Sequence, residues 1–477
     1  MELDLSAGWG AFLIGVINLA ATVTAICHAV LTKRDVRAAA GWTGLILLVP
    51  ILGWVIYFVL GINRIQRRAR ELRHIERRGP ERLLQSLEDL GARRALLPRL
   101  ARANSVVATT RLATGNTVEL LRNGDETYPA MLEAIAQART SIALSTYIFN
   151  HDEAGLMFVE ALAAAQDRGV RVRILIDGLG TWYSFPSMIR KLREKNLPHA
   201  RYLYSLLPWR MAYLNLRNHQ KIMVVDGTIG FTGGINIAKG NLLSHAPHHP
   251  IRDTHFRITG PVVRQLMETF ATEWEFTTGE QLVDDTWFPD LASTGNIIAR
   301  GLPGGPDLGK NPIRWTLMTA LTEARERIRI VTPYFLPDIT LRTLIALAAM
   351  RGVQVDIVLP EKNNLAYIAW AAMPQLEELT TAGVHVWFAS GPFDHSKLMT
   401  VDDGWSLIGS ANWDPRSLRL NFEFNLECYG DDLAHAINRE IDARLANATK
   451  VTSDMLHARP LHRKLRDGFV RLLSPYL

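Results

Sequence analysis

The chain has 477 residues, enough for two or three domains with cores of their own. Charged residues make up 21% and hydrophobic residues 48%, a balance that excludes a largely disordered protein. The net charge of +6 suits an anionic partner, either nucleic acid or an acidic membrane surface. With only two cysteines, Cys27 and Cys428, the sequence offers no disulfide framework and no cysteine-based metal site.

Two long apolar segments open the sequence. Residues 7–32 and 38–63 contain no formally charged side chain, and each exceeds the roughly 20 residues with which a helix crosses a hydrocarbon core. Residues 33–37 between them are too few for more than a turn, so residues 1–63 are predicted to form a transmembrane helical hairpin whose two ends lie on one side. The acidic residues Glu2 and Asp4 argue against a cleaved signal peptide. A buried core hairpin is the alternative.

Basic residues predict the orientation of this hairpin. The turn contains three cations, Lys33, Arg34 and Arg37, and the segment after the second apolar run contains more. These are Arg64, Arg67, Arg68, Arg70, Arg73, Arg77 and Arg78. The positive-inside rule therefore favours the cytoplasm for the rest of the chain, although the turn opposes this orientation. Residues 64–112 are predicted to be a basic juxtamembrane linker of short helices, either along the membrane surface or simply solvated.

Strand-like and helix-like segments alternate after the linker. Predicted strands at 140–149 and 170–177 enclose a predicted helix at 155–167, which makes a β-α-β unit. The same order returns as a strand at 328–332, a helix at 340–350 and a strand at 353–359. Because residues 167–172 also match residues 350–355, the chain contains a duplication. We predict an α/β fold with one lobe at 113–290 and a second at 291–450.

Each half contains one copy of a sharper motif. The first is Asn-His-Gln-Lys-Ile-Met-Val-Val-Asp at 218–226, and the second is Asp-His-Ser-Lys-Leu-Met-Thr-Val-Asp at 394–402. Counted from His219 or His395, lysine follows at +2, aspartate at +7, glycine at +14 and asparagine at +17. The residues at these positions are Lys221, Asp226, Gly233 and Asn236 in the first copy and Lys397, Asp402, Gly409 and Asn412 in the second. Two structural histidines would not need this shared spacing, so a duplicated catalytic site is predicted.

The residue types of the motif suit transfer at phosphorus. A neutral imidazole is a competent nucleophile, and a free pKa of about 6.5 lets a second imidazole act as an acid near neutral pH. Lysine and asparagine donate hydrogen bonds to anionic phosphoryl oxygens, which a metal would otherwise stabilise. His219 and Lys221 alternate with Gln220 and are expected on one face of a strand. Since lysine beside histidine repels a cation, we expect no metal and no other cofactor.

The doubled His-x-Lys-x₄-Asp pattern resembles the phospholipase D superfamily, and its surroundings resemble the bacterial cardiolipin synthases. The similarity covers nearly the whole chain, including the N-terminal segment. The stretches that carry it are 218–219, 232–238, 252–255, 260–263, 332–335, 409–417 and 421–427, together with Trp42, Pro50, Gly53, Tyr57 and Gly61. The resemblance implies two phospholipase D-like α/β lobes related by a pseudo-twofold axis.

The resemblance also implies a role for each matching residue. His219 is expected to attack phosphorus and His395 to protonate the leaving group, although the order could be reversed. Superfamily members use an acidic residue downstream of each motif to bind its histidine, and the matching positions are Asp253 and Glu423. Such a carboxylate would fix the tautomer of the ring and stabilise the imidazolium.

The remaining motif residues are expected to support this chemistry. Asp226 and Asp402 complete the motif, but their positions at strand ends favour a structural role. The glycines permit a close backbone approach, which could add a phosphate donor. The supporting set is Asn236, Asn412, Gly233, Gly409 and Ser410.

The predicted activity joins two phosphatidylglycerol molecules into cardiolipin, with loss of glycerol, through a covalent phosphohistidine. Water as the acceptor would instead make the protein a phospholipase D, which shares the first half-reaction. A superfamily nuclease is compatible with the basic pI but not with two membrane spans, and the intact motifs argue against an inactive membrane scaffold. We expect phosphatidylglycerol, other anionic phospholipids and the bacterial inner membrane as partners, no nucleic acid, and make no prediction of an oligomer.

Two further segments have open interpretations. Residues 202–213 are apolar and aromatic, and they either dip into the membrane interface or belong to the core. Residues 451–477 form a basic amphipathic C-terminal segment, which is predicted either to associate with the membrane surface or to be an ordinary exposed helix.

Overall fold

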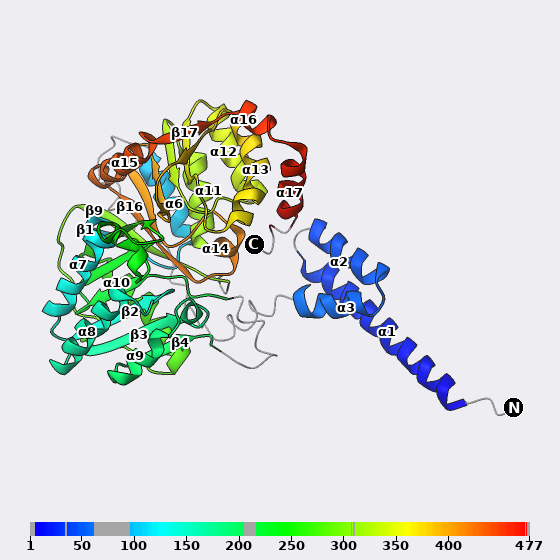
Figure 1. Cartoon of the computed structure of the whole chain (residues 1–477), viewed down its shortest axis with the longest axis horizontal. Coiled ribbons are helices and arrows are strands. Elements are labelled where there is room, and N and C mark those ends of the chain that lie inside the picture. The colour runs from blue at the N-terminus through cyan, green and yellow to red at the C-terminus, as the bar shows by residue number, and fades with distance from the viewer. Residues whose placement is uncertain are drawn as a thin grey trace. The chain divides into compact units, whose positions relative to one another are not determined.

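The computed structural model describes residues 5–33, 36–61, 96–204, 216–306, 308, 311–472 and 474. The chain divides into two compact units, Met1–Arg73 and His74–Leu477 (Figure 1).

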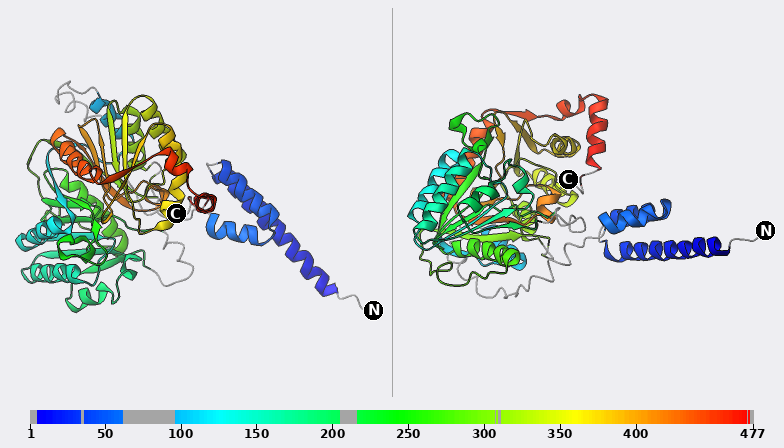
Figure 2. Two further views of the ribbon diagram at one scale, coloured as in Figure 1. Left: turned by 45° about the horizontal axis from the view of Figure 1, so that its top comes forward. Right: turned by 60° about the horizontal axis from the view of Figure 1, so that its bottom comes forward.

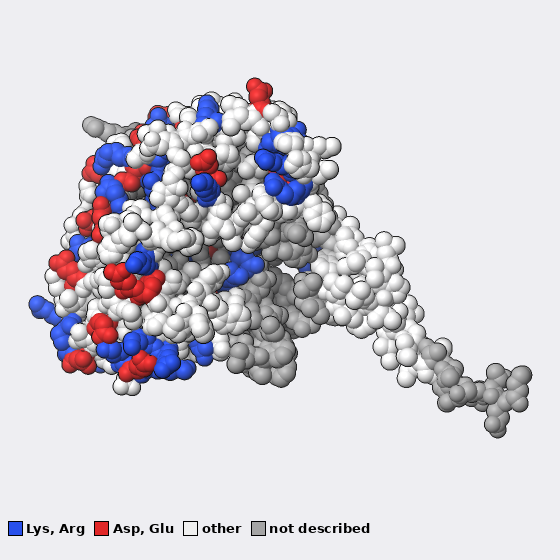
Figure 3. Space-filling model, in the orientation of Figure 1, with Lys and Arg blue, Asp and Glu red and all other residues white. Residues whose placement is uncertain are grey.

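The first unit is a helical hairpin with one long arm. Helix α1 (Leu5–Thr32) contains Phe12–Thr32, the one stretch in the described residues that is long and apolar enough for a membrane span. Helix α2 (Val36–Leu48) packs beside it, so the predicted hairpin is present. On the face that Figure 3 shows, the described helices of this unit are almost free of charged side chains, as expected for a segment in contact with lipid.

The second arm is not one continuous helix, contrary to the prediction. Helix α2 ends at Leu48, and after Pro50 the chain continues as α3 (Leu52–Ile56) and a π-helix (Tyr57–Gly61). Proline causes this break because it lacks an N–H and its ring clashes with the carbonyl of the preceding helical turn.

After the break the chain runs back along α1. Tyr57 lies with its hydroxyl 2.8 Å from Nδ1 of His28, and the ammonium of Lys33 donates to the carbonyl of Gly61. Helices α2 and α3 both lie beside the C-terminal half of α1, whose N-terminal half extends alone (Figure 1). The end of the second arm therefore returns to the turn between the arms.

The second unit is built on one 15-stranded sheet in the described ranges, with strand order β17-β12-β11-β10-β14-β15-β16-β9-β1-β8-β6-β5-β2-β3-β4. The order runs outward from the central antiparallel pair β1–β9 through matching strands on both sides, as a pseudo-twofold relation requires. The first lobe contains β1 (Ala113–Arg122), β2 (Ser141–Thr146), β3 (Arg171–Asp177), β4 (His199–Tyr202), β5 (Ile222–Val225), β6 (Ile229–Gly233) and β8 (Thr254–Thr259). The second contains β9 (Ile297–Gly304), β10 (Arg327–Val331), β11 (Gln354–Pro360), β12 (His385–Ala389), β14 (Leu398–Val401), β15 (Trp405–Gly409), β16 (Glu423–Tyr429) and β17 (Ala448–Val451).

Helices cover both faces of the sheet in each lobe (Figure 2). In the first lobe, α7 (Asn123–Gln137), α8 (Glu153–Asp167) and α9 (Met188–Glu194) enclose one core, and α10 (Val263–Thr278) packs on the other face. Their counterparts in the second lobe are α11 (Pro312–Glu323), α12 (Ile339–Met350), α13 (Ala366–Thr381) and α15 (Asp431–Leu445). Short 3₁₀ turns at Gly180–Trp182, Lys239–Asn241 and Leu243–His245 and helix α14 (Pro415–Arg419) complete the lobes.

The duplicated β-α-β units predicted from the sequence are confirmed as β2-α8-β3 and β10-α12-β11. In both units the two strands pair in parallel, Ile142 opposite Val172 and Ile328 opposite Val355. The lobe boundary predicted at residue 290 lies between α10 and β9. The α/β fold therefore follows the repeat that the sequence contains.

The end of the predicted linker packs into the second lobe. Residues 62–95 lie outside the described residues, but α6 (Leu96–Val107) buries Leu100 and Ala101 completely. Asn104 donates to Glu427 at 2.6 Å, and Glu427 forms a fully buried ion pair with Arg300. This helix is therefore part of the second unit, a setting that neither interpretation of the linker anticipated.

The C-terminal segment forms α16 (Ser453–His457) and the amphipathic helix α17 (Leu461–Arg471). Helix α17 packs on α13 through Val470, beside Ala371 and Ala372, and through Arg466, whose guanidinium lies 4.1 Å from the ring centroid of Trp370. Asp467 is buried and accepts hydrogen bonds from Arg459 and Arg466. Basic side chains gather over this helix (Figure 3), and its apolar stripe is exposed at Leu461, Leu465, Phe469 and Leu472. The amphipathic helix is thus present, and its association with a membrane surface stays a prediction.

Candidate active site

The two copies of the motif meet between the lobes. His219 precedes β5 and His395 precedes β14, the matching strands of the two lobes. The centroids of the two imidazole rings are 6.5 Å apart, and the ring planes are inclined at 81°. The two side chains are only 10% and 12% exposed. The predicted meeting of two histidines in one shared site is present in the structure.

Backbone hydrogen bonds between the lobes position both histidines. The N–H of His219 donates to the carbonyl of Phe422 at 2.8 Å, and the N–H of His395 donates to that of Arg252 at 2.7 Å. The second contact extends a small parallel pair between β7 (Ile251–Arg252) and β13 (Phe393–Asp394). Each motif is therefore fixed by the backbone of the opposite lobe.

The carboxylates cross over in the same way. Nδ1 of His219 lies 2.9 Å from Glu423, and Nδ1 of His395 lies 2.8 Å from Asp253. The expectation that each acid binds the histidine of its own motif is wrong: Asp253 and Glu423 reach across the interface, because the backbone pairing places each one beside the motif of the other lobe. With Nδ1 occupied, Nε2 is the nitrogen left for chemistry in both rings.

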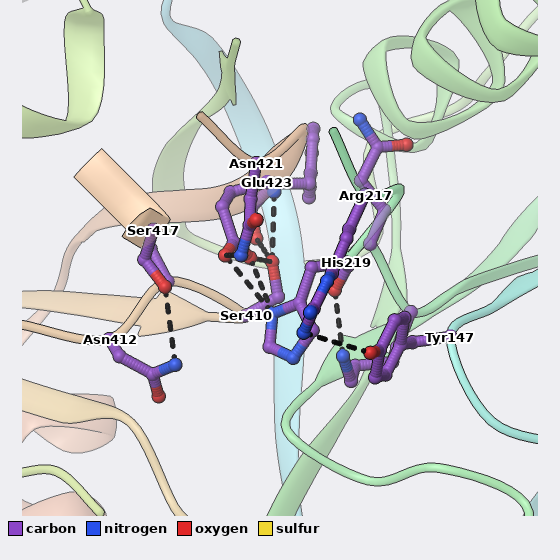
Figure 4. Close-up of polar contacts among 12 residues, drawn as sticks. Tyr147, Arg217, His219, Ser410, Asn412, Ser417, Asn421 and Glu423 are labelled. Atoms are coloured by element: carbon purple, nitrogen blue, oxygen red, sulfur yellow. Dashed lines mark hydrogen bonds and ion pairs between the residues drawn. The ribbon is translucent and has the colours of Figure 1, made fainter. Parts of the chain in front are cut away.

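The Glu423 carboxylate has further donors around it. Ser410 donates through its hydroxyl at 2.6 Å and Asn421 through its amide at 3.0 Å, on the side of the His219 ring opposite Tyr147 (Figure 4). Burial raises the pKa of Glu423 to about 7, although the charge of Lys221 opposes this shift. Ser410 thus supports the carboxylate that orients His219.

The pKa of the carboxylate shifts in the opposite direction in the second pair, His395 and Asp253. Burial alone would raise the pKa of Asp253, but the hydrogen bond from His395 and the charges of His395 and Lys397 outweigh it and lower the pKa below its usual range. Burial lowers the pKa of both histidines, that of His219 to well below its usual value, and Asp253 opposes the shift at His395. The electrostatics thus favour the neutral form of both rings, more strongly at His219 than at His395, where Asp253 stabilises the charged form.

Two buried ammonium groups flank the histidines. Nζ of Lys221 donates to the carbonyl of His219 at 2.7 Å, and Nζ of Lys397 donates to the carbonyl of His395. Burial lowers their pKa values to about 7 and about 8. An anion between the histidines would stabilise both charged forms. The site is therefore ready to bind a negatively charged group.

Strand β5 begins at Ile222, so His219 and Lys221 lie just before the strand and not in it, yet the expected alternation is present. The ring centroid of Tyr147 lies 5.1 Å from that of His219 and 5.5 Å from Nζ of Lys221, so both motif side chains face this ring. Gln220 between them is buried, and its amide has no hydrogen-bond partner among the described residues.

The aspartates at the ends of the motifs accept hydrogen bonds from backbone N–H groups. Asp226 accepts hydrogen bonds from the N–H groups of residues 139–141, directly before and at the start of β2. Asp402 accepts from those of residues 325–327 at the start of β10. Both carboxylates therefore connect the end of a motif strand to the start of its neighbour.

The motif glycines allow neighbouring strands to pack closely. Gly233 and Gly409 have φ values of 154° and 147°, which favour glycine. A Cβ at Gly233 would lie 2.7 Å from the carbonyl of Thr254, and one at Gly409 would lie 2.4 Å from that of Phe424. The close approach is to the strands beside Asp253 and Glu423, so the glycines help to position the carboxylates.

The two asparagines of the motif differ in their contacts. Asn236 accepts a hydrogen bond from the N–H of Ile148 at 3.2 Å. Asn412 donates to the hydroxyl of Ser417 at 3.2 Å, and its buried Oδ1 has no partner among the described residues. The positions match by sequence spacing, but the hydrogen bonds do not.

Sequence reasoning missed several residues beside the histidines. Tyr147 and Tyr334 contact His219 and His395 edge to face at 5.1 Å and 6.2 Å between ring centroids. Both tyrosines follow the first strand of a β-α-β unit, a signal that the repeat contained. Arg444, in contrast, binds Asp394 at 2.6 Å from 50 residues away, and no local pattern connects the two.

The residues of the site do not form a metal-binding set. Within the ranges that the structure describes, no three or more His, Cys, Asp or Glu side chains are arranged around a common point for a metal. Residues 205–215, which include most of the predicted aromatic segment before the first motif, lie outside those ranges.

Comparison with known proteins gives a consistent result. A family model described as "Cardiolipin synthase, PLD-like domain" matches residues 131–274 and 317–445, and one described as "Phospholipase_D-nuclease N-terminal" matches residues 20–61. The chain is 30% identical to the major cardiolipin synthase of Bacillus subtilis, over 93% of this chain and 95% of that protein. It is also 30% identical to a cardiolipin synthase of Staphylococcus aureus, over 98% and 96% of the two chains.

Among solved structures, the chain resembles phosphatidylserine synthase from Haemophilus influenzae. The TM-score is 0.60 at 16% identity, over 79% of this chain and 100% of the other. This similarity concerns the fold.

The crossed carboxylates can be tested by titrating the histidines. Asp253→Asn removes the opposite charge beside His395 and should lower the pKa of that ring by about 1–3 units, with a smaller effect on His219. Glu423→Gln should act mainly on His219. ¹⁵N-histidine NMR of the full chain, assigned with His219→Gln and His395→Gln, measures both rings. Effects confined to the histidine of the same lobe would contradict the crossed arrangement.

Proposed function

The chain belongs to the cardiolipin synthase family of the phospholipase D superfamily, whose members are phosphatidyl transferases, and we propose that it joins two phosphatidylglycerol molecules into cardiolipin with release of glycerol. The observation that carries this proposal is the pair of shielded imidazoles 6.5 Å apart, each bound to a carboxylate from the opposite lobe. Two such rings suit a double displacement at one phosphorus atom.

In the first half-reaction, Nε2 of His219 attacks the phosphorus of the donor lipid. The bond from phosphorus to the oxygen of the glycerol headgroup breaks, and protonated His395 donates its Nε2 proton to that oxygen. The products are glycerol and a phosphatidyl group bonded to His219. In the second half-reaction, His395 takes the proton of the acceptor's hydroxyl, whose oxygen attacks phosphorus and releases His219. Lys221 and Lys397 would donate to the non-bridging oxygens.

The difference between the two histidine–carboxylate pairs supports these roles. A nucleophile must be unprotonated, and burial together with the charge of Lys221 lowers the pKa of His219 well below its usual value. A general acid needs support for its charged form, and the Asp253 carboxylate beside His395 has a lowered pKa and so stays ionised.

Burial of the site favours a lipid acceptor over water. His219, Lys221 and Lys397 are at least nine-tenths buried, so water has restricted access to the reacting atoms. The apolar helix α1 supports a position at a membrane, where the substrates would be phosphatidylglycerol and other anionic phospholipids. Nucleic acid has no comparable support, despite the net positive charge.

For the membrane arrangement we propose the bacterial inner membrane, with α1 as the crossing helix. The 13 residues of α2 span about 20 Å, less than the roughly 30 Å of a hydrocarbon core. Because the chain then returns from Pro50 to Lys33, the second arm enters and leaves on one side. This proposal replaces the two crossings predicted from the sequence.

This arrangement also removes a conflict in the charge pattern. In a hairpin with two crossings, the basic turn and the basic segment after Asn63 would lie on opposite sides. When the second arm returns, both basic segments lie on one side and the acidic N-terminus, with Glu2 and Asp4, lies on the other. The positive-inside rule then assigns the cytoplasm to the catalytic unit without opposition.

The proposed function predicts the products. Full-length protein in vesicles of phosphatidylglycerol should form cardiolipin and glycerol in equal amounts, and His219→Asn should abolish both. Lipid mass spectrometry and an enzymatic glycerol assay measure them. If phosphatidic acid is the sole lipid product, the protein is a phospholipase D and not a synthase.

The roles of the histidines predict different behaviour with a phosphatidyl ester of p-nitrophenol, whose leaving group needs no proton. His395→Asn should release a stoichiometric burst of nitrophenolate and retain the phosphatidyl group on His219, because the second step lacks its base. His219→Asn should give no burst. Stopped-flow absorbance and peptide mapping measure the two outcomes. A burst in His219→Asn and none in His395→Asn would reverse the assignment.

The membrane arrangement predicts the labelling of single cysteines introduced into a Cys27→Ser background, in which the remaining Cys428 is buried. An impermeant maleimide added to intact spheroplasts should label Asp4→Cys, but neither Asp35→Cys nor Asn63→Cys. Opened membranes, in which all three should react, are the control. Two crossings would instead put positions 4 and 63 on the same side and position 35 on the other.

A further inference from the structure

Arg217 lies beside the nucleophilic histidine. Its carbonyl accepts a hydrogen bond from the N–H of Phe422 at 2.8 Å, and its guanidinium donates to the hydroxyl of Tyr147 at 3.2 Å. The buried Nε has no hydrogen-bond partner among the described residues. Figure 4 shows the side chain running past the ring of His219 toward Tyr147. The guanidinium thus lies next to a reacting centre and has a buried N–H without an acceptor. Such a group suits an anionic ligand.

A second arginine comes from the opposite lobe. Arg416 lies in the first turn of α14, and its carbonyl accepts from the N–H of Asn421 at 2.9 Å. Asn421 directly precedes Phe422, so the backbones of both arginines are attached to consecutive residues of one segment. Burial lowers the pKa of Arg416, and the positive charge of Arg217 lowers it further. Two like charges in a partly buried place repel each other, and an anion between them would remove that cost.

The two arginines do not belong to the duplicated motif. The offset between the repeats is 395 − 219 = 176 residues. The same offset matches Arg217 with Phe393 and Arg416 with Gly240. Lys239, which precedes Gly240, is 44% exposed and pairs with Glu153 at 3.0 Å, so it has a different partner from Arg416. The catalytic residues obey the pseudo-twofold relation, whereas this pair breaks it. The pair therefore supplies something that only one side of the reaction needs.

We propose that Arg217 and Arg416 bind the phosphate of the acceptor lipid. This inference rests on the proposed function, in which the acceptor is a second phosphatidylglycerol. That molecule carries its own phosphodiester three carbons away from the attacking hydroxyl, so the product holds two phosphates on one glycerol. The histidines and lysines bind the first phosphate, and the second needs donors of its own.

Guanidinium groups suit this task because their planar donors match phosphate oxygens in pairs. Water and free glycerol carry no phosphate and would gain nothing from these arginines. The pair would thus select a lipid acceptor after the phosphatidyl group has been transferred to His219. It would act on the partition between transfer and hydrolysis, not on the first bond cleavage.

The test compares two acceptors of the same phosphatidyl group. Full-length protein in phosphatidylglycerol vesicles is given labelled glycerol, which enters phosphatidylglycerol by exchange, while cardiolipin forms in parallel. Arg217→Gln and Arg416→Gln should each lower the ratio of cardiolipin formed to glycerol exchanged by about 10- to 100-fold, the equivalent of losing one charged hydrogen bond. Arg217→Lys and Arg416→Lys, which keep the charge, should recover part of the ratio.

The matched control is Arg419→Gln, on the same helix α14. Arg419 is 59% exposed and lies 3.8 Å from Asp338, and its removal should leave the ratio unchanged. If exchange and cardiolipin synthesis fall together in the Arg217 and Arg416 variants, the arginines bind the donor or only maintain the fold, and the proposal is wrong. A wild-type protein that exchanges glycerol but forms no cardiolipin would instead contradict the proposed function.

Discussion

The reciprocal binding of each histidine by a carboxylate from the opposite lobe is the constraint on which the rest of the site depends. Glu423 orients His219 and Asp253 orients His395, and the backbone bonds to Phe422 and Arg252 enforce the same exchange. Neither lobe holds a complete pair, so the lobes must associate before either imidazole has its proper tautomer. The continuous sheet through β1 and β9 keeps the lobes in that relation.

This arrangement concentrates charge where the protein is nearly dry. Two lysines, two carboxylates and two histidines lie in one shielded region, and burial shifts most of their pKa values toward the neutral forms. Such a group of charges is costly without a ligand. An anionic phosphate between the imidazoles would balance the lysines. The same features that destabilise the empty site would therefore strengthen its binding of the reacting group.

Some residues of the site obey the pseudo-twofold relation between the lobes, and others break it. The motif strands, the aspartates at their ends and the packing glycines obey the pseudo-twofold relation and build the scaffold. The departures lie next to the histidines: Glu423 faces one imidazole and Asp253 the other, and the repeat offset matches Arg217 with Phe393 and Arg416 with Gly240. In the proposed mechanism the two histidines perform different steps, which need different surroundings. A duplicated framework can supply them only where the copies have diverged.

The sequence by itself determined the repeat, the β-α-β units, the motif residues and the apolar first unit, because each depends on spacing or periodicity within a short stretch of chain. It also predicted that His219 and His395 share one site, but it gave no role there to Tyr147, inside the predicted strand 140–149, or to Tyr334, inside the stretch 332–335. Pro50 is a local signal for the interruption of the second arm. The prediction of a second span used only the length of the apolar segment and so did not take this signal into account.

Only the tertiary structure decided which carboxylate binds which histidine. Glu423 is 204 residues away from His219, and Asp253 is 142 residues away from His395. Distances of that kind depend on how the two lobes pack, and spacing within one motif says nothing about them. The attachment of Arg217 from the first lobe to Phe422 of the second and the return of the second arm to Lys33 have the same origin. Local sequence specifies elements and residue types, whereas pairing across an interface comes from the packing of whole lobes.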